Sequence, residues 1–180
     1  MADAGGAALI PVSDRATREA ARALIREYLA FIQDSARSHY GLEFDVGAMV
    51  ESDIHDQSKF YPPRGRFYLA RHARGYVGVG CLKTLAPGVA EIQRMYLRPE
   101  SRGLGAGRQI LERLLADARE MGFERVRLES LKFLAPAHAL YRSVGFREID
   151  PYADSSMRDF QPAESMARYR ASVVFMELRI

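Results

Sequence analysis

The sequence has little of what disulfide-bonded, metal-stabilised and membrane-spanning proteins depend on. Its 180 residues include a single cysteine, Cys81, so an intramolecular disulfide is excluded. The four histidines lie in separate segments, without the spacing of metal ligands. No apolar run approaches the roughly 18 residues of a membrane span, and the first residues lack the basic start and long apolar stretch of a secretory signal. We therefore expect a cytoplasmic protein with no metal and no membrane partner.

Lysine is scarce as well. All but three of the 26 basic residues are arginine, and the formal net charge is only +3. The planar guanidinium suits phosphates and carboxylates, although the codon usage of a genome explains such a bias more simply. A nucleic-acid-binding domain usually shows a larger basic excess and a motif of interleaved basic and aromatic residues, and neither is present. We therefore expect no nucleic-acid partner.

The length and the apolar pattern indicate one domain, from residue 1 to residue 180, in which strands and helices alternate. A helix is expected after the capping residue Asp14, up to about Ala36, because apolar residues then recur at steps of three and four. Short turns at 72–75 and 86–88 separate three strands that follow. Strands are expected at residues 7–12, 66–71, 76–84, 90–97, 126–130, 146–149 and 171–180, and further helices at about 46–51, 107–118 and 136–143 and from 162–165 onward.

A glycine-rich loop stands where one strand gives way to a helix. Gly103, Gly105 and Gly107 occupy alternate positions there, between Arg102 and Arg108. Glycine allows the backbone to approach a ligand closely, and the first amides of a helix favour an anion, above all a phosphate. A P-loop does not fit, because its lysine and its hydroxyl residue are missing. A dinucleotide fingerprint does not fit either, because its third glycine is missing. The alternative is that the glycines only permit a tight turn.

The charge around this loop agrees with a phosphate site. Between residues 94 and 108 there are four arginines and one acidic residue, so the local excess of +3 equals the formal net charge of the chain. We interpret this excess as a local binding site for a polyphosphate.

Two motifs together resemble the GNAT superfamily of acyl-CoA-dependent N-acetyltransferases. Arg102, Gly105 and Gly107 after a strand match its Arg/Gln-x-x-Gly-x-Gly/Ala signature, and residues 140–146, Leu-Tyr-Arg-Ser-Val-Gly-Phe, look like its Leu-Tyr-x-x-x-Gly-Phe element. The order of elements agrees along nearly the whole chain. The resemblance implies an α/β (α+β) fold with a mixed, mostly antiparallel central sheet of about six or seven strands. It further implies helices on both faces, and a bulge and V-shaped splay at the fourth strand.

The same resemblance implies acetyl-CoA as cosubstrate, bound by a core at about residues 90–150. Pantetheine would pair with the strand backbone and pyrophosphate would lie on the loop, so the implied binding residues are Met95, Tyr96, Leu97, Arg102, Gly103, Leu104, Gly105, Ala106, Gly107 and Arg108. One position departs from the family. Leu134 stands where many relatives carry an asparagine that bonds coenzyme A, so we expect that contact to be lost or replaced by backbone.

The implied activity is acetyl transfer to a primary amine of a small molecule or peptide, directly within a ternary complex. The amine must first lose a proton, and the leaving thiolate gains from a proton donor. Tyr141 matches the family's donor, and Glu91 and Glu129 match positions where members carry a catalytic base, Glu91 being slightly preferred. Water relayed to bulk is a third route for the proton.

The acceptor itself is not readable from the sequence. The resemblance assigns the acceptor side to residues of about 31–61 and 152–170, and we hypothesise that the second stretch acts as a lid. A non-catalytic acyl-CoA-binding or regulatory module is the alternative function. A homodimer is the simplest expectation for any oligomer.

Overall fold

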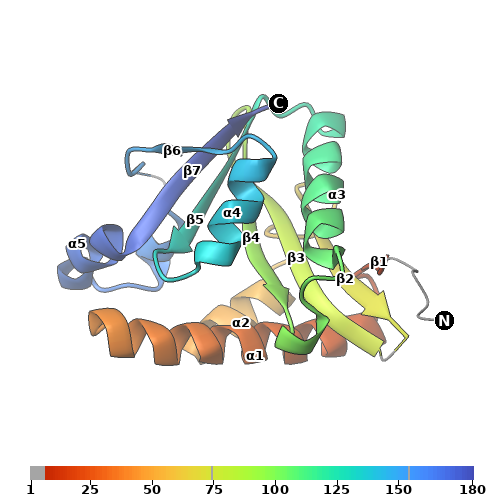
Figure 1. Ribbon diagram of the computed structural model, residues 1–180, viewed down its shortest axis with the longest axis horizontal. Coiled ribbons are helices and arrows are strands. Elements are labelled where there is room, and N and C mark those ends of the chain that lie inside the picture. Colours follow the sequence, from red (N-terminus) through yellow and green to blue (C-terminus); the bar gives the residue numbers. More distant parts are fainter. Residues whose placement is uncertain (1–6, 74, 154) are drawn as a thin grey trace.

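A seven-stranded mixed sheet forms the centre of the molecule (Figure 1). The computed structural model describes residues 7–73, 75–153 and 155–180. The strands lie in the order β1-β2-β3-β4-β5-β7-β6, and within the described chain β4 and β5 form the one parallel pair. Their bounds are β1 (Ala8–Pro11), β2 (Gly65–His72), β3 (Gly75–Ala86), β4 (Val89–Leu97), β5 (Arg125–Leu131), β6 (Arg147–Ile149) and β7 (Val173–Arg179).

Helices cover both faces of this sheet because the strand residues alternate between two apolar cores. On β2, Phe67 and Leu69 pack with the first two helices, whereas Tyr68 and Ala70 pack with the third. The helices are α1 (Arg15–Tyr40), α2 (Val46–His55), α3 (Ala106–Glu120), α4 (Ala135–Ser143) and α5 (Ala163–Ser172), with short 3-10 turns η1 (Pro99–Ser101) and η2 (Ser156–Asp159). The predicted fold class, with its mostly antiparallel sheet between helices, is therefore confirmed.

The ends of the elements differ from the sequence prediction by a few residues. Asp14 caps α1 as expected, in a reciprocal capping box with Thr17, but the helix continues beyond Ala36 to Tyr40 and ends at Gly41 with φ +62°.

No helix of the described ranges is long and apolar enough to cross a membrane. The predicted turn at 72–75 includes Arg74, and the amino-terminal prediction includes residues 1–6; these positions lie outside the described residues.

The splay between β4 and β5 has a visible cause in the register. Tyr96 pairs with Val79 and Gln93 with Cys81, so two residues of β4 stand opposite one residue of β3, which is a β-bulge. On its other edge, β4 pairs with β5 only over Val89–Glu91 in the described strands. The remaining halves of β4 and β5 separate and leave backbone edges facing one another. The predicted V-shaped opening is therefore present.

Candidate active site

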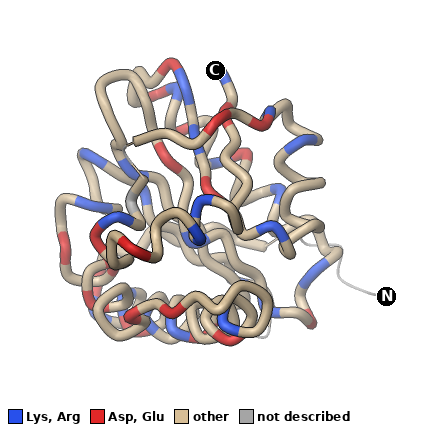
Figure 2. Tube along the Cα trace, turned by 90° about the vertical axis from the view of Figure 1, so that its left-hand side faces the viewer, with Lys and Arg blue, Asp and Glu red and all other residues tan. Residues whose placement is uncertain are grey.

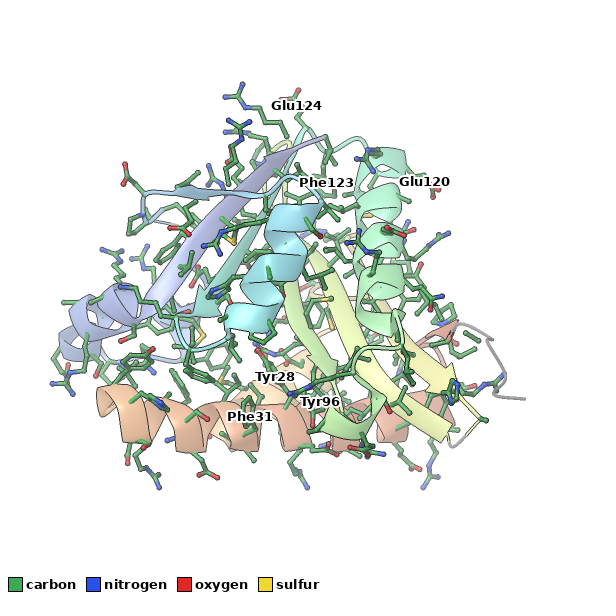
Figure 3. All side chains as sticks on the ribbon, viewed as in Figure 1. Tyr28, Phe31, Tyr96, Glu120, Phe123 and Glu124 are labelled. Atoms are coloured by element: carbon green, nitrogen blue, oxygen red, sulfur yellow. The ribbon has the colours of Figure 1, made fainter. Side chains whose placement is uncertain are left out.

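A pocket of about 560 Å³ occupies the opening between β4 and β5. Its walls are residues 92–97 of β4, the glycine-rich loop, residues 128–130 of β5, the segment from Phe133 to Tyr141, and two side chains of α1. Those two side chains are Tyr28 and Phe31, which in Figure 3 lie on the side of α1 that is turned toward the sheet. A pocket with a free strand edge along one wall can bind an extended ligand through main-chain hydrogen bonds.

The glycine-rich loop brings the start of α3 to this pocket. Gly103 and Gly105 have φ of +79° and +82°, a left-handed conformation that side chains rarely adopt. Gly105 is the N-cap of α3 and offers no side-chain cap, so the first amides of the helix remain available to a ligand. A Cβ on Gly107 would lie 3.3 Å from Leu97, so glycine also allows the helix to approach β4.

Most of the implied binding residues line the pocket, but two do not. Leu104 and Ala106 are on the other side of the loop, where the Leu104 side chain is 62% exposed. The lining members are Met95, Tyr96, Leu97, Arg102, Gly103, Gly105, Gly107 and Arg108. Leu134, which replaces the family's asparagine, also lines the pocket and adds an apolar side chain there.

Two of the four arginines near the loop serve the fold and not the loop. Arg94 turns inward to Asp53, and Arg98 forms an ion pair with Glu27 at 3.0 Å. Arg102 and Arg108 line the pocket and keep their charge near the start of α3, although Arg108 also donates to the Ser143 hydroxyl at 2.8 Å. Basic and acidic positions are likewise interspersed along the chain in Figure 2. The local excess available to a phosphate is therefore smaller than the sequence suggests.

Tyr141 lies on α4 and lines the pocket. The residue is 6% exposed, and its hydroxyl has no hydrogen-bond partner among the described residues. Burial, with a smaller contribution from Tyr28, raises the pKa of Tyr141 above its usual value. The phenol therefore stays protonated at neutral pH and can donate a hydrogen bond or a proton to a neighbouring anion.

Glu129 lies on β5 and also lines the pocket. Its Oε2 accepts hydrogen bonds from the hydroxyls of Tyr169 at 2.7 Å and Ser155 at 3.0 Å. Its Oε1 is buried without a partner among the described residues. Burial, followed by the negative charge of Glu91, raises the pKa of Glu129 to about 7. A carboxyl with that pKa is suited to take up and release protons near neutral pH.

Glu91 occupies a different place. It lies on β4 with 1% of its surface exposed, and it is not among the lining residues of the pocket. Its carboxylate accepts hydrogen bonds from Gln93 at 2.6 Å and from the Tyr152 hydroxyl at 3.1 Å, and Lys83 lies 3.7 Å away. The two candidate bases are therefore not equivalent, because only Glu129 faces the cavity.

A buried ion cluster, which no pattern in the sequence predicts, holds the bulge of β4. Asp53 of α2 is fully buried and accepts hydrogen bonds from Arg94 Nε at 2.5 Å and Nη2 at 3.3 Å, and it also pairs with Lys59. Among the described residues other than glycine, Arg94 alone has a positive φ, of +55°. The strained backbone of the bulge is thus held in place by Asp53, a side chain of α2. Burial lowers the pKa of Lys59, and the Asp53 carboxylate opposes that effect.

The hydroxyl groups that contact the two glutamates were also missed. Tyr152, Ser155 and Tyr169 all belong to the stretch of 152–170 that was assigned to the acceptor side. Their only signal in the sequence is the unusual length of the connection between the last two strands. Among the described residues, no group of three or more metal-ligating side chains comes together.

Comparisons with known proteins agree with this geometry. A model of the acetyltransferase (GNAT) family matches residues 20–146. An uncharacterised N-acetyltransferase of Schizosaccharomyces pombe is 30% identical over 132 residues, covering 72% of this chain and 76% of that protein. An uncharacterised N-acetyltransferase of Escherichia coli is 34% identical over 118 residues, covering 63% of this chain and 71% of that protein.

Solved structures share the fold at lower identity. An acetyltransferase from Streptococcus agalactiae superposes with a TM-score of 0.72 at 17% identity, over 97% of this chain and 99% of that chain. The PaiA N-acetyltransferase of Thermoplasma acidophilum, solved in complex with coenzyme A, gives a TM-score of 0.63 at 16% identity, over 96% of this chain and 99% of that chain.

Proposed function

Because this chain belongs to the GNAT family and is an acyltransferase, we propose that it transfers an acetyl group from acetyl-CoA to a primary amine within a ternary complex. One observation carries the proposal. The pocket in the β4–β5 splay has an uncapped helix start with two arginines along one wall, and it also contains Tyr141 and Glu129.

Acetyl-CoA fits the described residues in two places. The free edge of β4 at Met95 to Leu97 can pair with the amides of pantetheine, as an added strand would. The amides from Gly103 to Arg108 can receive the pyrophosphate at the start of α3, with Arg102 and Arg108 adding charge-assisted hydrogen bonds. The thioester then lies toward Tyr141 in the same pocket.

The residues of the pocket allow a balanced transfer step. Glu129 takes a proton from the ammonium, the free amine attacks the thioester carbonyl, and a tetrahedral oxyanion forms. The carbon–sulfur bond then breaks, Tyr141 donates its proton to the leaving thiolate, and the tyrosinate takes up the surplus proton of the acylated nitrogen, which keeps one N–H in the neutral amide product. We assign the base to Glu129 and not to Glu91, because Glu129 lines the cavity. Glu91 acts through its charge, which raises the pKa of Glu129.

Binding and turnover test this proposal separately. Isothermal titration should detect acetyl-CoA, and Arg108→Ala should weaken that binding about tenfold by removing a charge-assisted contact. Arg119→Ala is the matched control, because Arg119 is exposed near the other end of α3. Thiol release should then be measured with a panel of amines. Failure to bind acetyl-CoA would refute the proposal, whereas binding without transfer would favour a non-catalytic acyl-CoA-binding module.

A further inference from the structure

Aromatic side chains form the wall of the pocket that α1 and the segment after β5 contribute. Tyr28 and Phe31 are three residues apart on α1, hence on one face of the helix, and both line the pocket. Phe133 packs edge-on against Phe31, with ring centroids 6.0 Å apart. In Figure 3, Tyr28 and Phe31 lie near one another on α1, which runs below the sheet in this view. This wall offers flat apolar surfaces to a ligand.

Phe31 remains uncovered in the folded chain. It is 41% exposed, although it belongs to the regularly spaced apolar face of α1 on which Leu24 and Ile25 are buried and Tyr28 is half-buried. Leu104 of the glycine-rich loop is the other large hydrophobic residue exposed to this degree among the described positions. An apolar ring left open at the rim of a pocket is typical of a surface that a ligand covers.

The charges of the pocket restrict that ligand further. Among the described lining residues, Glu129 is the one acid, and the cations are Arg94, Arg102 and Arg108. Arg94 is occupied by Asp53, and the other two stand at the start of α3. An acceptor ammonium therefore finds Glu129 and the aromatic faces, both of which attract a cation. A carboxylate on the acceptor would meet Glu129 without a free cation to balance it.

From these contacts we infer that the acceptor is an arylalkyl primary amine without a carboxylate. Its ring packs against Phe31 and Phe133, and its amine is directed to Glu129. The inference rests on the proposed acetyl transfer and narrows it. Amino acids are disfavoured by their carboxylate, and polyamines because Glu129, the one acid among the described lining residues, balances a single ammonium.

A panel with acetyl-CoA held constant tests this class in the full-length protein. We expect kcat/KM for 2-phenylethylamine to exceed that for phenylalanine and for spermidine at least about tenfold. Phe31→Ala should raise the KM for 2-phenylethylamine about tenfold and leave the KM for acetyl-CoA unchanged, and Phe31→Leu should restore part of the loss. Asp34→Ala is the control, because Asp34 is exposed on the same helix outside the pocket wall.

The outcomes separate this inference from the function on which it rests. Equal or faster acetylation of phenylalanine or spermidine would overturn the arylalkylamine class while supporting acetyl transfer. Acetyl-CoA binding without turnover of 2-phenylethylamine, or an unchanged KM in Phe31→Ala, would likewise overturn it. Failure to bind acetyl-CoA in the calorimeter would instead refute the proposed function.

Discussion

Glu129 should make the stability of the protein depend on pH in a way that one substitution removes. Burial and the charge of Glu91 raise the pKa of its carboxyl from 4.5 to about 7, against the hydrogen bonds of Tyr169 and Ser155 that lower it. Between these two values the unfolded chain has lost the proton and the folded chain keeps it. The folded state is therefore penalised increasingly as pH rises from about 4.5 to 7, and the full penalty is present above 7.

The size of this penalty follows from the shift. At about 1.4 kcal/mol per pKa unit, the difference between 4.5 and about 7 corresponds to about 3 kcal/mol of unfolding free energy. Glutamine has nearly the shape of a protonated glutamate and does not ionise. The free energy of unfolding of Glu129→Gln, relative to the wild type, should therefore rise by about 3 kcal/mol between pH 4.5 and pH 8.

Urea denaturation followed by circular dichroism at several pH values measures this difference. Groups distant from residue 129 titrate alike in both proteins, so their contributions cancel in the subtraction. Glu120→Gln is a matched control, since Glu120 is exposed at the end of α3, and its difference from the wild type should stay constant (Figure 3). A constant difference for Glu129→Gln as well would refute the assignment of a raised pKa to this carboxyl.

Three further substitutions probe the site. Tyr141→Phe should lower kcat in the thiol-release assay more than it changes the KM for acetyl-CoA, because it removes the proposed proton donor; an unchanged kcat would show that the phenol does not act on the thiolate. Tyr169→Phe removes a hydrogen bond that lowers the pKa of Glu129, so the midpoint of the rise of kcat/KM with pH should move upward, and a shift downward would contradict this reasoning. Asp53→Asn leaves two buried cations without their counterion and should lower the free energy of unfolding, measured by urea denaturation, by about 3–5 kcal/mol. A loss below about 1 kcal/mol would mean that the cluster does not stabilise the bulge.

The elements that the sequence predicts well are those whose signals are local. The apolar face of α1 repeats at helical spacing, Asp14 supplies its cap, and turn residues delimit β2, β3 and β4. The glycine-rich loop is likewise readable, because the left-handed conformations at Gly103 and Gly105 require glycine within a few residues of one another. These features depend on neighbours in the chain and not on the rest of the fold.

The parts that escaped prediction depend on contacts between distant segments. Asp53 and Arg94 are 41 positions apart in the sequence, and neither the polar stretch before residue 58 nor the bulge in β4 indicates that they pair. The bulge itself breaks the two-residue period of the strand, so no facing rule identifies the inward turn of Arg94. The different environments of Glu91 and Glu129 arise in the same way, from side chains that the sheet brings together.

The stretch of 152–170, which we hypothesise to act as a lid, contacts both the connection between α1 and α2 and the candidate base. Gln161 donates to the Glu43 carbonyl at 2.8 Å, and the Tyr169 ring packs edge-on against Phe44 at 6.4 Å, so this stretch is joined to the connection between α1 and α2. Tyr169 also donates to Glu129. Any movement that opened this stretch would admit water to the carboxyl, which lowers its pKa, and would break the hydrogen bonds from Tyr169 and Ser155, which raises it; because burial is the largest contribution, the net change is downward. The protonation of Glu129 is therefore linked to the position of this stretch.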